Sequence, residues 1–174
     1  MSSIDYELSR IRGIAFDVDG VLSPQVVPLG DDGIPQRMAN LRDGYALVQA
    51  VKAGLEIAII SGGESEALRR RFEIIGIRDV YLGAGAKMPM LREWMTRRGL
   101  AADEVAYVGD DVPDVEPMRA VGLAVAPSDA CPDAYMAARY ITRAAGGYGV
   151  ARELIEQIMR DGNQWPGQSV SLGQ

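Results

Sequence analysis

Short apolar runs alternate along this chain with longer segments whose apolar residues recur at helical spacing. The short runs are rich in β-branched residues, which favours strands. The longer segments carry the apolar stripe of helices that pack on one side, and several are followed by glycine, a common helix end. The expected strands are Ile11–Phe16, Leu55–Ile60, Asp79–Leu82, Val105–Val108, Leu123–Ala126 and Arg139–Thr142. The expected helices are Gly44–Ala53, Glu64–Ile75, Met88–Arg98, Asp114–Val121 and Val150–Arg160.

The order of these elements predicts the fold class. Strands that alternate with helices are typical of a parallel sheet covered on both faces. We therefore expect an α/β fold, with a Rossmann-like parallel sheet and helices on both faces. A chain of 174 residues suits one domain with a substantial core. That domain is expected over residues 1–161, with a polar C-terminal tail over residues 162–174.

One segment between Val21 and Arg42 interrupts the alternation. Two short runs, Val26–Leu29 and Gln36–Ala39, flank the turn-forming sequence Gly-Asp-Asp-Gly at residues 30–33. Such a pattern predicts a small β-hairpin, at about residues 24–40, inserted after the first strand.

Polar residues follow four of the expected strands. Ligands in open α/β sheets bind beyond the carboxyl ends of the strands, so these residues are expected to share one rim. Two carboxylates one residue apart after a buried strand favour a cation, and the adjacent Gly20 leaves room for a ligand. We therefore expect a site for Mg²⁺ and a phosphate group. The rim residues are Asp17, Asp19, Ser61, Gly62, Lys87, Asp110, Asp111 and Asp114.

Each of these residue types also has an ordinary structural role. Carboxylates after a strand form Asx turns, a serine before a helix caps it, and most lysines are solvated. Acidic residues stabilise a helix N-terminus, but one cap needs only one carboxylate. Three acids in Asp110, Asp111 and Asp114 therefore exceed what capping requires. Because polar residues also follow the other strands at the same expected edge of the sheet, a functional site is favoured.

Composition narrows the chemistry further. The chain has no histidine, which excludes histidine bases, ligands and nucleophile pairs. Its one cysteine, Cys131, has no base beside it and suits a reducing, cytoplasmic location. A net charge of -6 argues against nucleic acid as a partner. No apolar run is long enough to cross a bilayer, so no membrane partner is expected.

Taken in order, the rim segments resemble the four motifs of haloacid-dehalogenase superfamily phosphatases. The first is the sequence Asp-Val-Asp-Gly-Val from Asp17, and the others centre on Ser61, Lys87 and the Gly-Asp-Asp at residues 109–111 with Asp114. Within the superfamily the chain resembles 3-deoxy-D-manno-octulosonate 8-phosphate phosphatases and their sialic-acid-type relatives. These carry a hairpin in place of a large cap domain. They also share the segments seen here at residues 40–44 and 146–149.

The resemblance implies a Mg²⁺-dependent phosphatase that forms an aspartyl-phosphate on Asp17, with Asp19 as general acid and base. The implied Mg²⁺ ligands are Asp17, the Asp19 backbone carbonyl and Asp110, with Asp111 and Asp114 holding waters or Lys87. Residues implied to bind the phosphate or the rest of the substrate are Ser61, Gly62, Lys87, Asn40, Arg42, Asp43, Gly44 and Arg71. Two of these have plainer alternatives, because Arg42 adjoins Asp43 and Arg71 lies in a run of three arginines.

Family membership would also imply a small phosphorylated sugar acid as substrate, a place in lipopolysaccharide biosynthesis, and a homotetramer in which a neighbour's hairpin helps to close the site. Three positions depart from the pattern: Gly63 and Tyr148 each stand where the family often has arginine, and Ser-Pro-Gln at residues 23–25 replaces an Asp-Gly pair. The first two departures remove cations that could meet the substrate. They leave catalysis intact but leave open the exact sugar acid, with a nonulosonate 9-phosphate as an alternative substrate. A separate alternative is a non-catalytic oligomerisation or regulatory module, against which the intact Asp17, Asp19, Lys87 and Asp110 argue. A phosphomutase would need a larger cap.

Overall fold

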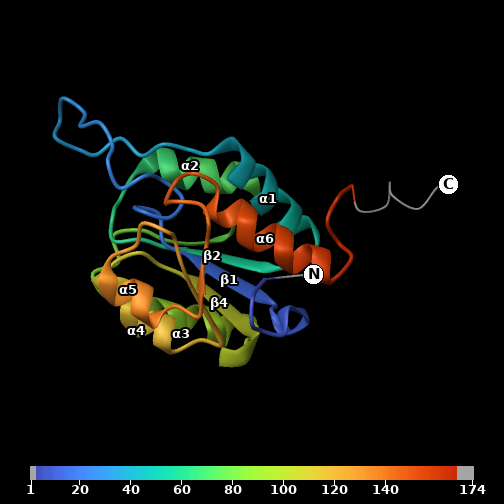
Figure 1. Ribbon diagram of the computed structural model, residues 1–174. Coiled ribbons are helices and arrows are strands. Elements are labelled where there is room, and N and C mark those ends of the chain that lie inside the picture. Colours follow the sequence, from blue (N-terminus) through green and yellow to red (C-terminus); the bar gives the residue numbers. More distant parts are fainter. Residues whose placement is uncertain (1–2, 168–174) are drawn as a thin grey trace.

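The computed structural model describes residues 3–167, which form a six-stranded sheet between two layers of helices (Figure 1). All five strand pairs are parallel, in the order β3-β2-β1-β4-β5-β6. The expected α/β fold with a parallel sheet is thereby confirmed. The strands are β1 (Gly13–Phe16), β2 (Glu56–Ile60), β3 (Asp79–Tyr81), β4 (Val105–Val108), β5 (Leu123–Ala126) and β6 (Tyr140–Ile141).

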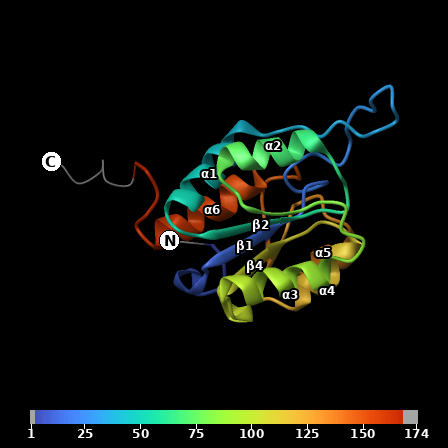
Figure 2. The ribbon, with the colours of Figure 1, turned by 180° about the vertical axis from the view of Figure 1, so that it is seen from behind.

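Three helices cover each face of the sheet, as the two opposite views show (Figures 1 and 2). One layer contains α1 (Leu41–Lys52), α2 (Glu66–Ile75) and α6 (Val150–Asp161), and the other contains α3 (Lys87–Arg98), α4 (Val115–Arg119) and α5 (Pro132–Ala137). Short 3₁₀ turns lie at Leu8–Arg10, Ala102–Glu104 and Val112–Asp114. No helix within residues 3–167 has the length and apolar character needed to cross a membrane.

Strand β1 shows how the apolar runs fill both layers. Ile14 and Phe16 belong to one core, whereas Ala15 belongs to the core on the opposite face. Successive side chains on a strand point to opposite faces, so a strand buried on both sides is apolar throughout. The second core is built around Trp94 and Tyr107, both fully buried.

The inserted segment differs from the expected hairpin. It projects beyond the helical layer, with one antiparallel bridge between Leu29 and Pro35 and a bond from Gln36 N–H to the Pro28 carbonyl (Figure 1). The turn and one antiparallel bridge of the expected hairpin are present, but residues 26–29 and 36–39 do not form continuous strands. Pro28 and Pro35 have no N–H group to donate to a ladder, which prevents regular pairing. Helix α5 was not predicted, since its six residues are too few to show a clear period.

The start of the predicted tail is packed onto the domain. Trp165 is buried, with its ring 6.0 Å from that of Tyr45 in an edge-on arrangement. The Arg152 guanidinium lies 4.6 Å from the Trp165 ring centre. A tryptophan buries a large apolar area and anchors a segment that is otherwise polar. The packed chain therefore extends to Trp165, and residues 168–174 lie outside the described part of the structure.

Candidate active site

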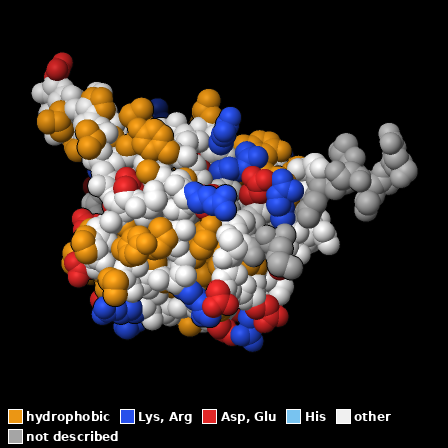
Figure 3. Space-filling model, viewed as in Figure 1, with side chains coloured by type: hydrophobic (Ala, Val, Ile, Leu, Met, Phe, Trp, Pro, Cys, Tyr) orange, Lys and Arg blue, Asp and Glu red, His pale blue; other side chains and the backbone are white. Residues whose placement is uncertain are grey.

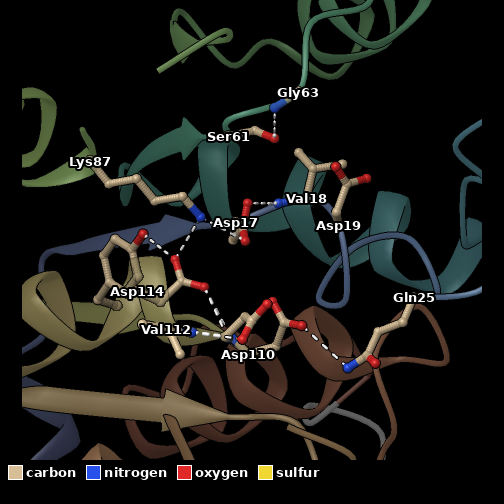
Figure 4. A network of polar contacts seen from close by, with 12 residues as sticks. Asp17, Val18, Asp19, Gln25, Ser61, Gly63, Lys87, Asp110, Val112 and Asp114 are labelled. Carbon is tan, nitrogen blue, oxygen red and sulfur yellow. Dashed lines mark hydrogen bonds and ion pairs between the residues drawn. The ribbon is translucent and has the colours of Figure 1, made fainter. Parts of the chain in front are cut away.

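The carboxyl ends of the central strands open into a cleft of about 760 Å³ (Figure 4). Ser61 lies fully buried just beneath it, where its Oγ accepts a hydrogen bond from Gly63 N–H at 3.2 Å. Ser61 is not a helix cap, because α2 begins at Glu66 and is capped by Ser65. The predicted rim residues that line the cleft are Asp17, Asp19, Gly62, Lys87, Asp110, Asp111 and Asp114.

Of the two carboxylates that follow β1, Asp17 is buried and Asp19 is more exposed. Asp17 Oδ1 accepts a hydrogen bond from Val18 N–H at 2.7 Å, and its Oδ2 lies 2.7 Å from Lys87 Nζ. Burial raises the pKa of Asp17 well above its ordinary value, and the nearby Asp114 raises it further, while Lys87 opposes both effects. A buried carboxylate held by a single lysine is poorly hydrated, which favours reaction with a phosphorus centre.

Lys87 opens α3 and joins two acids from different strand ends. Its Nζ lies 2.7 Å from Asp17 Oδ2 and 2.7 Å from Asp114 Oδ1. Burial opposes the charged ammonium, but the two carboxylates outweigh burial and raise the pKa of Lys87. The interpretation of Lys87 as a solvated lysine is therefore wrong. It remains protonated across the physiological range and carries a fixed positive charge at the cleft floor.

Asp114 organises the loop after β4. Its Oδ1 also accepts a hydrogen bond from Tyr107 Oη at 2.8 Å, and its Oδ2 accepts from the N–H groups of Asp110 and Asp111 at 3.0 and 3.3 Å. Asp111 caps the following 3₁₀ turn, where its Oδ1 accepts from Val112 N–H at 2.8 Å. Both Asp114 oxygens are committed, so this side chain positions Lys87 and Asp110.

The carboxylates of Asp17, Asp110 and Asp114 offer oxygens within 4.8 Å of one another. Asp110 Oδ1 is buried and has no hydrogen-bond partner within residues 3–167. Burial, followed by the charges of Asp114 and Asp111, raises the pKa of Asp110 to about 7. One ammonium does not balance three buried carboxylates, whereas a divalent cation with oxygen ligands would. The donor set therefore fits Mg²⁺.

Gly20 makes the close approach to this cluster possible. A Cβ at this position would lie 1.9 Å from Asp110 Oδ2, and the backbone is left-handed with φ +81. Only glycine meets both conditions without strain. Gln25, which was not predicted as a site residue, completes the surroundings of Asp110 by donating to its Oδ2 at 3.2 Å.

Asp19 differs from Asp17 in exposure and in its partner. Its side chain is 46% exposed and is held by Arg37 through two bonds of 2.9 Å, from Nε to Oδ1 and from Nη2 to Oδ2. Arg37 was missed by the sequence reasoning. It lies in the insert, 18 residues from Asp19, and no local pattern indicates which carboxylate a long side chain will meet.

Most of the residues that resemblance assigned to the sugar end of the substrate lie elsewhere in this protomer. Asn40 caps α1 by accepting from Arg42 N–H at 2.9 Å and Asp43 N–H at 3.1 Å, and its Nδ2 donates to the Gly147 carbonyl. Arg42 is exposed at the start of α1. Their role in substrate contact stays a prediction. The predicted residues that line a second, smaller cavity behind the insert are Asn40, Asp43, Gly44 and Arg71.

The Asp43 carboxylate in this second cavity makes stability depend on pH. Burial raises its pKa to about 6, partly opposed by the bond of 2.8 Å from Arg152 N–H. The folded protein keeps this proton up to about pH 6, whereas the unfolded chain loses it near 3.8. The contribution of Asp43 to stability is therefore full below pH 3.8 and is lost as the pH rises through 6.

We expect Asp43→Asn to gain stability relative to the wild type as the pH rises, because the variant has no charge to bury. The relative gain in the free energy of unfolding between pH 4 and pH 7 is about 2 kcal/mol. Urea denaturation of both proteins at pH 4, 5, 6 and 7 measures it. Curves that stay parallel over this range would show that Asp43 does not titrate as described.

Comparison with known proteins agrees with this geometry. No family model matches the chain. The 3-deoxy-D-manno-octulosonate 8-phosphate phosphatase KdsC of Escherichia coli is 38% identical over 150 residues, which cover 86% of this chain and 80% of that protein. The KdsC of Yersinia pestis is 35% identical over 151 residues, covering 87% and 81%.

Solved structures give the same result. The Yersinia pestis phosphatase crystal structure superposes with a TM-score of 0.87 at 34% identity, covering 92% of this chain and 86% of that one. The Moraxella catarrhalis phosphatase, in complex with a magnesium ion, a phosphate ion and a KDO molecule, has a TM-score of 0.84 at 30% identity and covers 88% of both chains. The fold and the acidic cleft are thus those of a haloacid-dehalogenase superfamily hydrolase. More narrowly, the chain belongs to the 3-deoxy-D-manno-octulosonate 8-phosphate phosphatase family, which confirms the resemblance.

Proposed function

We propose that this protein is a Mg²⁺-dependent phosphatase that removes the 8-phosphate from 3-deoxy-D-manno-octulosonate 8-phosphate. The observation that carries the proposal is the set of buried ion pairs that Lys87 makes with Asp17 and Asp114, beside Asp110 Oδ1, which has no hydrogen-bond partner among the described residues. Curated relatives bear this activity in their names, and the Moraxella catarrhalis structure contains magnesium, phosphate and KDO together.

The proposed mechanism uses the two aspartates that follow β1. An Asp17 carboxylate oxygen attacks the phosphorus, and the bond from phosphorus to the sugar oxygen breaks. Asp19 gives a proton to the departing sugar oxygen, then takes a proton from the water that hydrolyses the aspartyl-phosphate. Mg²⁺, held by Asp17, Asp110 and the Asp19 backbone carbonyl, would neutralise charge so that two anions can meet.

Neighbouring groups support the transfer of the phosphoryl group. Lys87 lies at the cleft floor beside Asp17 and carries the positive charge that the phosphoryl oxygens require. Ser61 Oγ and the backbone N–H of Gly63 lie across Asp17 from Asp110 and Asp114 (Figure 4). The hydroxyl and the backbone N–H groups on that side supply donors to the same oxygens.

We further propose a homotetramer in the cytoplasm. The insert exposes apolar side chains, including Val26 at 89% and Leu29 at 69%, and hydrophobic groups gather on the projecting segment in Figure 3. An exposed apolar surface of this kind is stabilised when another protein surface covers it. The single cysteine supports a reducing compartment, and production of a free sugar acid would serve lipopolysaccharide biosynthesis.

Phosphate release with a panel of substrates tests the function. With Mg²⁺ present, we expect 3-deoxy-D-manno-octulosonate 8-phosphate to exceed nonulosonate 9-phosphates and common sugar phosphates by at least about tenfold in kcat/KM, a difference of about 1.4 kcal/mol. EDTA is expected to abolish turnover. Preference for another ester would keep the chemistry and refute the substrate, while a folded, Mg²⁺-binding protein without turnover would indicate a regulatory module.

A further inference from the structure

The insert places one largely enclosed cation at the edge of the cleft. The Arg37 side chain is only 9% exposed, although the neighbouring residues Gln36 and Met38 are exposed. Three of its N–H groups are engaged, two by Asp19 and one by the Pro35 carbonyl at 3.3 Å. A guanidinium has five N–H groups, so Arg37 has donors to offer to a further anion.

Arg37 and Gly63 have complementary shapes. A Cβ at position 63 would lie 2.2 Å from Arg37 Nη2, 2.9 Å from its Cζ and 3.1 Å from Asp19 Oδ2. The backbone of Gly63 is not left-handed, so its conformation does not demand glycine. The missing side chain is instead what admits the guanidinium. Arg37 thus places a positive charge where the sequence lacks one at position 63.

The charged groups that line the cleft are mostly acidic, so an anionic substrate needs a nearby cation. Lys87 is the only lysine or arginine that lines the cleft within residues 3–167, and it is engaged by Asp17 and Asp114. The lining also includes the further carboxylates of Asp110, Asp111 and Asp129. A phosphorylated sugar acid carries a second anionic group, its carboxylate, in addition to its phosphate. Lys87 and the proposed Mg²⁺ would be used by the cleft carboxylates and the phosphoryl group, so the carboxylate of the sugar acid needs a further cation.

We propose that Arg37 is the residue that selects a carboxylate-bearing substrate, by binding the carboxylate of the leaving group from its position over Gly63. The proposal rests on the proposed function, because the mechanism places the leaving group at Asp19, the partner of Arg37. A planar guanidinium binds a carboxylate through two parallel hydrogen bonds, a geometry that lysine does not offer. The phosphoryl group is bound separately, at Asp17 and Lys87.

Two variants test the proposal by different routes. Arg37→Ala removes the cation, and Gly63→Ala displaces it with a methyl group while keeping the arginine. We expect each to raise KM for 3-deoxy-D-manno-octulosonate 8-phosphate by about tenfold to hundredfold, the effect of losing a hydrogen-bonded charge. KM for p-nitrophenyl phosphate, which has no carboxylate, is expected to rise by a smaller factor than KM for the octulosonate ester, because any effect that passes through Asp19 or the turn at Gly63 is common to both substrates. Arg37→Lys should recover part of the loss, and Gln36→Ala is the control in the same segment.

The outcomes separate this proposal from the function on which it rests. Equal losses on both substrates would assign Arg37 only to the orientation of Asp19 and overturn the proposal, as would an unchanged KM for the sugar acid ester. If the wild type hydrolyses p-nitrophenyl phosphate but not the octulosonate ester, the proposed substrate fails. The same variants compared on a nonulosonate 9-phosphate and p-nitrophenyl phosphate then decide the role of Arg37, by the same selective change in KM.

Discussion

Asp17→Asn is expected to abolish phosphate release and to leave the fold intact. An amide does not form the phosphoryl bond that the carboxylate forms, so kcat should fall at least about 1,000-fold. The amide oxygen can still accept from Val18 N–H, and removal of a buried charge that is costly to desolvate limits any loss of stability. Phosphate release with Mg²⁺ and thermal unfolding, measured on the same preparation, check both expectations.

The control for this variant is Asp133→Asn. Asp133 is an exposed carboxylate on α5 and does not line the cleft, so the same chemical change there should leave kcat unaltered. Substantial turnover by Asp17→Asn, of the order of a few per cent or more of the wild type, would refute Asp17 as the nucleophile. Hydrolysis would then have to proceed by direct attack of water.

Lys87→Met is expected to lower both activity and stability. The substitution removes the ammonium that Asp17 and Asp114 share and leaves these buried carboxylates without their cation. Breaking such a buried pair costs about 3 kcal/mol of the free energy of unfolding, and the lost charge at the phosphoryl group lowers kcat at least about 100-fold. Denaturation in metal-free buffer and phosphate release with Mg²⁺ measure the two effects.

The chain offers a matched control, because Lys52 is its only other lysine and is exposed at the end of α1. Lys52→Met should change neither quantity appreciably. If Lys87→Met unfolded at the wild-type denaturant concentration, the ion pairs would contribute nothing net and the assigned electrostatics would be wrong. If it kept full activity, Lys87 would not act on the phosphoryl group.

The sheet and the rim of the cleft were predictable because both depend on local pattern. Strands buried on two faces must be apolar throughout, as β1 and β4 are, and helices packed on one side must carry a stripe. Parallel strands then bring their carboxyl ends to one edge whatever the details of packing. Asp17, Lys87 and Asp110 were therefore expected at one site, although they are up to 93 residues apart, from 17 to 110.

The insert, the short helix α5 and the packing of Trp165 were less predictable from the sequence. The insert has its turn and one antiparallel bridge but no longer ladder, since two prolines lack the backbone N–H groups that a ladder needs. Helix α5 has too few residues to show a period. Trp165 packs against the domain although its segment was expected to be a tail. Burial of its large aromatic ring stabilises this packing even though the neighbouring residues are polar.

The amino-acid sequence by itself determined the class of fold, the edge of the sheet that carries the chemistry, and the lysine and most of the carboxylates found there, Asp129 being the exception. Only the tertiary structure decided which of these groups are paired: Lys87 between Asp17 and Asp114, and Arg37 on Asp19 over Gly63. The physical reason is the distance along the chain over which each effect acts. Periodicity acts over a few residues, whereas a buried ion pair depends on where distant segments pack and on how far a flexible side chain reaches.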